Sequence, residues 1–130
     1  MITTNEGLIN PDHLIRARIK KKELHLYITT TISDKTRYRI DPGSGDLSID
    51  CILETVKKHP DFVKIADQDY VNRKHIAELR PVVDHELANY QIRVTTTENI
   101  ENKKRKYQVI NYTSYYKLME DLKRLIGGLF

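Results

Sequence analysis

The chain has 130 residues, of which 39% are hydrophobic and 31% charged, and its net charge is +4. This length has room for one hydrophobic core, and no apolar run reaches the roughly 18 residues of a membrane-spanning helix. The sequence therefore predicts one soluble domain over residues 1–130. The single cysteine, Cys51, excludes an internal disulfide, and the first residues lack the pattern of a secretory signal. Together these two features predict a cytoplasmic protein.

The first third of the chain alternates apolar and polar residues in the manner of a β-hairpin. Residues 24–32 and 36–40 are rich in β-branched and aromatic side chains at every second position, with residues 33–35 between them as the turn. Pro42 and Gly43 then break the pattern and are typical of a tight turn.

A helix is predicted after this break. Apolar residues recur at i, i+3, i+4 and i+7 in Ile49, Ile52, Leu53 and Val56, and Pro60 ends the segment. Period-two alternation then returns and predicts strands at residues 62–65, 70–72, 75–79, 90–94 and 106–110.

A second helix closes the chain and ends at Gly127. Its apolar stripe, expected to face the core, consists of Tyr115, Leu118, Met119, Leu122, Leu125 and Ile126. The sequence as a whole predicts a mainly β fold of antiparallel sheets with two short helices.

No catalytic or metal-binding pattern stands out. No two of the five histidines have the i, i+4 spacing that places two ligands on one helix face, and residues 84–86 (Asp-His-Glu) are typical of a polar hairpin turn. Cys51 lies close to the apolar stripe of the first helix, which predicts a half-buried structural thiol. We therefore expect no enzyme, no metal and no cofactor.

Charge is unevenly distributed along the chain. Residues 1–40 hold 8 basic and 4 acidic residues (+4), residues 41–90 hold 6 and 10 (−4), and residues 91–130 hold 8 and 4 (+4). A basic face of this kind is a possible footprint for nucleic acid, although lysine and arginine also occur on any solvated surface.

Two basic runs stand out within these segments. The first is Arg16, Arg18, Lys20, Lys21 and Lys22, and the second is Lys103, Lys104, Arg105 and Lys106. Cations at a hairpin tip can neutralise phosphates, whereas lysine on an edge strand can instead prevent aggregation. Both interpretations stay open for the first run. For the second, phosphate contact is favoured, because Asn99, Asn102, Gln108 and Asn111 lie alongside and can reach base edges.

Residues 52–126 resemble the LytTR family of bacterial DNA-binding domains. After a short helix, residues 62–65 (Phe-Val-Lys-Ile) are similar to the family's F-x-R-I-H-R-S strand, and residues 71–79 to its V-N-L-D-H-I-x-E-I segment. Residues 107–112 fall where the family has I-P-V-S-R, and residues 115–118 match its closing Y-x-x-L helix. Upstream, residues 14–40 would supply the opening hairpin.

This resemblance implies an elongated all-β domain of three small antiparallel sheets. Such domains usually bind promoter DNA through loops in successive major grooves, often with paired copies on direct repeats. The chain would be a stand-alone transcription regulator whose partners are duplex DNA and a regulatory protein or a second copy of itself. Phosphates would be held by Lys64, Arg73, Lys74, Lys103, Lys104, Arg105 and Lys106. Bases would be faced by Gln68, Asn102, Asn111 and Tyr112.

Three positions differ from the family pattern. Ala66, Asp67 and Tyr112 stand where family members commonly present a His, an Arg and a second Arg to bases. Asp67 and Asp69 are also carboxylates, which repel phosphate. These differences favour an alternative hypothesis, a LytTR-like scaffold that has lost DNA binding and serves as a protein–protein interaction module.

Overall fold

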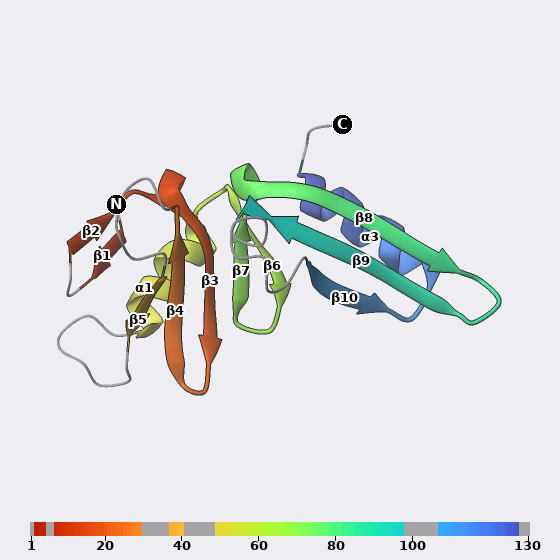
Figure 1. The fold of residues 1–130 in the computed structure, drawn as a ribbon, viewed down its shortest axis with the longest axis horizontal. Helices are drawn as coiled ribbons and strands as arrows, with labels where there is room; N and C mark the ends of the chain where they lie inside the picture. The colour runs from red at the N-terminus through yellow and green to blue at the C-terminus, as the bar shows by residue number, and fades with distance from the viewer. Residues whose placement is uncertain (1, 5–6, 30–36, 41–48, 98–106, 128–130) are drawn as a thin grey trace. The chain divides into compact units, whose positions relative to one another are not determined.

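The computed structural model describes residues 2–4, 7–29, 37–40, 49–97 and 107–127. These residues form three antiparallel sheets and two α-helices, which confirms the predicted mainly β class (Figure 1). The chain divides into two compact units, residues 1–74 and 75–130. The interpretation of residues 1–130 as one domain stays a prediction.

The first unit contains a five-stranded sheet in the order β5-β4-β3-β7-β6. Its strands are β3 (Leu14–Lys20), β4 (Glu23–Ile28), β5 (Arg37–Ile40), β6 (Phe62–Ala66) and β7 (Asp69–Asn72). A separate two-stranded sheet pairs β1 (Ile2–Thr4) with β2 (Gly7–Ile9). The predicted pairing of the segments that form β4 and β5 is confirmed, whereas β1, β2 and β3 were not predicted from alternation.

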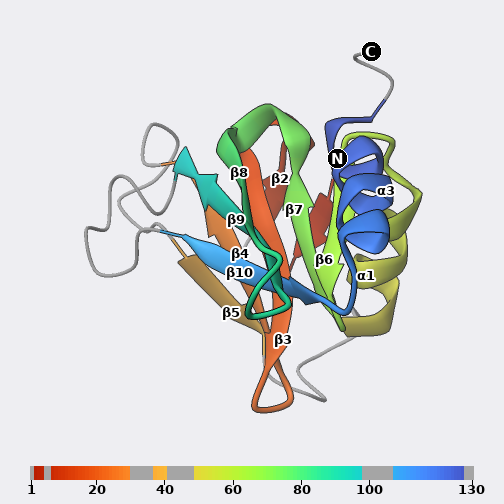
Figure 2. The ribbon, with the colours of Figure 1, turned by 90° about the vertical axis from the view of Figure 1, so that its right-hand side faces the viewer.

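Helix α1 (Ile49–Lys58) packs against one side of this unit, on β6 and β1 (Figure 2). Three residues of the predicted stripe, Ile52, Leu53 and Val56, are buried in the core. Asp50 in its first turn and the lysines in its last turn suit the helix dipole. The sheet residues in the same core cluster include Ala17, Leu24, Leu26, Ile28, Phe62 and Tyr70. Burial of each large aliphatic side chain contributes about 1.5–3 kcal/mol.

The second unit is a three-stranded sheet, β10-β9-β8, with one helix along it. Its elements are β8 (Ile76–Asp84), β9 (Asn89–Thr96), β10 (Gln108–Tyr112) and α3 (Tyr115–Ile126). The turn at residues 85–88 joins β8 to β9, as predicted for the Asp-His-Glu cluster. Strand β8 continues past the predicted end at residue 79, because Pro81 is tolerated on an edge strand.

Helix α3 begins and ends as its sequence predicts. The Ser114 side chain accepts from the Lys117 N–H at the start, and Gly127, with a φ of 66°, donates to Lys123 and Arg124 at the end. Within the stripe, Leu118 and Leu125 are buried, but Leu122 is only half-buried. The expectation that Leu122 is a core residue was therefore wrong, because it lies at the margin of the packed face.

The turn between β3 and β4 has an unusual backbone. Its two residues, Lys21 and Lys22, have φ values of 52° and 67°. Positive φ at both central positions is the pattern of a type I′ turn, for which Asn-Gly is preferred. An L-residue with a Cβ in this region costs roughly 1–2 kcal/mol.

Candidate nucleic-acid interface

The β3–β4 turn and the β6–β7 turn lie side by side at one end of the five-stranded sheet (Figure 1). The β6–β7 turn contains Asp67 and Gln68, both exposed, and Gln68 has a φ of 52°. The Ile19 N–H donates to the Gln68 carbonyl at 2.9 Å, which places this turn beside the end of β3. Gln68, predicted to face bases, is thus held on a turn that projects from the sheet.

Lys64 lies on β6 with an exposed side chain. Its Nζ is 3.9 Å from Asp67 Oδ1, and the Asp67 side chain is 93% exposed. A surface pair of this kind contributes about 0–1 kcal/mol, so a phosphate can compete with the carboxylate for the ammonium group. Lys64 can therefore hold a phosphate near Gln68.

Asp69 differs from Asp67 because it is buried. Its Oδ1 accepts from Arg16 Nε at 2.8 Å and its Oδ2 from Arg16 Nη2 at 2.5 Å, a two-pronged ion pair between β7 and β3. The Arg16 guanidinium also lies over the Tyr27 ring, 5.7 Å from the centroid. The charge of Asp69 is thus neutralised inside the sheet, and only Asp67 remains as an exposed carboxylate of the two.

Arg73 and Lys74 lie at the opposite end of β7, in the short 3-10 helix η2 (Arg73–His75). Arg73 Nη1 donates to the Pro60 carbonyl at 2.8 Å. The structure therefore does not bring these two predicted phosphate ligands together with Gln68. Strand β7, which rises roughly 3.3 Å for each residue, separates Gln68 from Arg73 and Lys74.

Lys74 is engaged with two carboxylates. Its Nζ is 2.9 Å from Asp12 Oδ1 and 3.3 Å from Asp61 Oδ2. Hydrogen bonds to Asp12 and Asp61 raise the pKa of Lys74, and the hydrogen bond from Lys74 lowers the pKa of Asp12. Binding of a phosphate by Lys74 must therefore compete with both acids.

Asn111 lies on an exposed face of the three-stranded sheet. It pairs with Gln91 across β9, on the face opposite the buried Ile92 and Val94. On the same face of β9, two residues beyond Gln91, the Arg93 guanidinium lies over the Tyr107 ring, 4.8 Å from its centroid. Arg80 on β8 is the residue opposite Arg93. Arg80, Gln91 and Arg93 are not among the predicted contacts, although the alternation over residues 90–94 places Gln91 and Arg93 on the outer face.

Tyr112 is oriented differently from Asn111. Its hydroxyl donates to Asp121 Oδ2 on α3, and Asp121 also accepts from Arg124 Nε. Burial and the hydrogen bond to Asp121 raise the pKa of Tyr112. Burial alone would raise the pKa of Asp121, but the hydrogen bonds from Arg124 and Tyr112 hold it below its usual value. While it donates to Asp121, the Tyr112 hydroxyl can only accept a hydrogen bond from a base, and it must leave Asp121 to donate one.

Substitution of Tyr112 by Phe tests which role the hydroxyl has. We expect the free energy of unfolding to fall by about 1 kcal/mol at pH 7, the value of one partly exposed hydrogen bond. The pKa of the Asp121 carboxyl is lower in the folded protein than its unfolded value of about 4, so Asp121 stabilises the folded protein above pH 4. This contribution is lost as the pH falls through the folded pKa. The difference between wild type and variant in urea unfolding should therefore shrink below pH 4. Reduced DNA affinity with unchanged stability would instead assign the hydroxyl to a base.

The remaining predicted contacts, Asn102, Lys103, Lys104, Arg105 and Lys106, lie outside the described residues. Their assignment to phosphates and bases stays a prediction.

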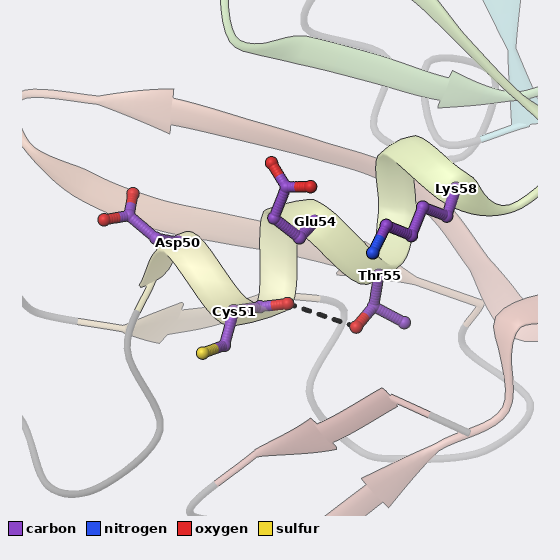
Figure 3. A pocket seen from close by; sticks show the side chains of 5 residues that line it. All are labelled: Asp50, Cys51, Glu54, Thr55 and Lys58. Atoms are coloured by element: carbon purple, nitrogen blue, oxygen red, sulfur yellow. Dashed lines mark hydrogen bonds between the residues drawn. The ribbon is translucent and has the colours of Figure 1, made fainter.

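The exposed side of α1 carries no comparable site. Cys51 is exposed, which corrects the expectation of a half-buried thiol, because it points away from the buried stripe. It lines a shallow depression with Asp50, Glu54, Thr55 and Lys58, and the Thr55 hydroxyl donates to the Cys51 carbonyl at 3.1 Å (Figure 3). Among the described residues, no group of three or more His, Cys, Asp or Glu could hold a metal ion. No helix in that part of the chain is long and apolar enough to cross a membrane.

Comparisons of the chain with protein-family models, with curated proteins and with solved structures find no match. The candidate interface therefore depends on the residues and contacts given above.

Proposed function

We propose that this chain is a cytoplasmic transcription regulator of the LytTR type that binds duplex promoter DNA. The fold supports the proposal at the level of class, since three antiparallel sheets and two helices are what the resemblance implies. The helix before β6, the strand pair β6–β7 and the closing helix α3 also follow one another in the expected order.

The observation that carries the proposal is the ion pair between Arg16 and Asp69. Without it, two acids only two positions apart, Asp67 and Asp69, would lie unneutralised at the β6–β7 turn. Because Arg16 neutralises Asp69 at 2.8 Å and 2.5 Å, the exposed surface of this turn keeps Lys64, Gln68 and one carboxylate, Asp67. This combination is compatible with a phosphate backbone.

Each exposed residue then has a distinct role. Lys64 contacts a phosphate and sets the position of the turn on the duplex, whereas Gln68 reads a base edge. A glutamine amide can form two hydrogen bonds with N6 and N7 of adenine in the major groove. Asn111, on the other unit, has the same chemistry and serves as a second base contact. Asp67 can accept a hydrogen bond from cytosine N4 or point away from the backbone.

A protein-interaction module is the second candidate function. The observation that favours it is Asp67, whose carboxylate is 93% exposed at the position where family members carry a base-contacting Arg. In this case the turn would bind a basic surface of a protein partner.

The substitution Asp67→Arg separates the two candidates. In a regulator it adds a phosphate contact, so duplex binding should strengthen at low salt and the slope of log affinity against log salt should steepen by about 0.9. The gain should fade at physiological salt, where exposed charges are screened within about 8 Å. A fluorescence titration with a labelled duplex at several salt concentrations measures both effects.

Glu54→Arg is the matched control, because it makes the same charge change at an exposed position on α1. We expect it to leave the slope unchanged. The regulator proposal is wrong if the wild-type chain binds no duplex at low salt. Loss of a protein partner from a pull-down with the Asp67→Arg variant would then support the interaction module.

A further inference from the structure

The tip of the β3–β4 hairpin presents three consecutive cations. Lys20 ends β3, Lys21 and Lys22 form the turn, and all three side chains are exposed. In the part of the chain that the structure describes, none of the three forms an ion pair with an acid. Within the described residues, the hairpin tip is thus a cluster of three exposed positive charges.

The backbone of this turn gives a second, independent observation. Lys21 and Lys22 both have positive φ, where asparagine and glycine are the favourable residues. A type I′ turn imposes positive φ at both central positions, so the two lysines are retained there at a cost in backbone energy. Two adjacent lysines in place of Asn-Gly favour a use for their charge.

The location of the tip indicates which anion it meets. The hydrogen bond from Ile19 to the Gln68 carbonyl joins the β6–β7 turn to β3 one residue before Lys20. Figure 1 shows both turns at the same end of the sheet. Among the described residues at this end of the sheet, the exposed or half-exposed acids are Glu23 and Asp67, against Lys20, Lys21, Lys22 and Lys64, so cations outnumber acids there.

We propose that Lys20, Lys21 and Lys22 hold phosphates of the DNA backbone beside the base edge that Gln68 contacts. This inference rests on the proposed function and adds a phosphate-binding hairpin that the resemblance does not supply. The contact is to the backbone, so it contributes affinity and position without sequence preference. It also assigns the first basic run to phosphate contact at its last three residues only, because Arg16 is engaged with Asp69 and Arg18 is half-buried on β3.

The double variant Lys21→Asn, Lys22→Gly tests this assignment in the full-length chain. Asparagine and glycine suit the turn, so the thermal unfolding midpoint of the variant should rise by a few degrees. The same change removes two cations, so binding to every duplex should weaken and the salt slope should shrink by about 1.8, or 0.9 for each contact. Higher stability with weaker binding cannot arise from a folding defect.

Two further variants complete the experiment. Lys20→Gln leaves the turn residues unchanged and should reduce the slope by about 0.9. Lys57→Gln with Lys58→Gln removes two neighbouring cations from the last turn of α1 and should leave the slope unchanged.

The outcomes distinguish this inference from the proposed function. If the wild type binds duplex DNA and the tip variants keep its slope, the hairpin does not contact phosphate, and the regulator proposal still stands. An equal loss of slope in the α1 variant would mean that net charge alone matters, and would also overturn the inference. Wild-type protein that binds no duplex at low salt overturns both proposals.

Discussion

Replacement of Asp69 by Ala is expected to lower the free energy of unfolding by about 3–5 kcal/mol. The substitution leaves the Arg16 guanidinium buried in the sheet without the carboxylate that holds it at 2.8 Å and 2.5 Å. The loss is large because a buried charge without its partner retains the penalty of leaving water. Urea unfolding followed by circular dichroism measures the change.

Asp67→Ala is the matched control, because it removes a carboxylate only two positions away. Its side chain is 93% exposed, and we expect a change within about ±0.5 kcal/mol. Replacing both members of the pair, with Arg16→Met and Asp69→Leu, should recover much of the stability, since apolar residues of similar volume often substitute for a buried ion pair. An Asp69→Ala variant as stable as Asp67→Ala would contradict the ion pair.

Leu118→Ala is expected to destabilise the second unit by about 2–5 kcal/mol, through lost burial and the cavity that remains. Leu118 is fully buried, with 0% exposure, on the face of α3 that packs against its sheet. Leu122 lies one turn further along and is half-buried, so Leu122→Ala should cost clearly less. The comparison of the two variants in thermal unfolding tests the orientation of α3. Equal losses would mean that the helix is rotated from the orientation described here.

Regular hydrophobic periods were enough to predict several elements. Ile52, Leu53 and Val56 define the buried face of α1, and Gly127 defines the end of α3, because both signals are local to a few residues. Strands β1 and β2 were missed because three residues are too few to show alternation. Strand β3 was not predicted from alternation, although Ile15, Ala17 and Ile19 alternate with basic residues; only the resemblance implied it, through the opening hairpin of residues 14–40.

The partner of Arg16 explains why the sequence could not reveal its role. Asp69 lies 53 positions further along the chain, and neither residue has a local signal that marks it as buried. The ion pair of Lys74, predicted as a phosphate ligand, was equally hidden, because its partner Asp12 lies 62 positions away in the chain. Lys64 and Gln68 were selected through the resemblance, and the structure places both on exposed surface, at β6 and the turn that follows it. Contacts between distant segments, rather than local pattern, limit what can be predicted of this interface.

The position of Arg16 and Asp69 on central strands also bears on how the sheet aligns as it folds. Strands β3 and β7 share only the pairs Arg16–Val71, Ala17–Tyr70 and Arg18–Asp69, so few contacts define their alignment. A slip of one residue turns every side chain of a strand to the opposite face. Such a slip of β3 would place Arg16 in the apolar layer beside α1 and leave Asp69 unmatched. The misaligned sheet would then contain two isolated charges, so the ion pair selects the native alignment against its nearest competitor.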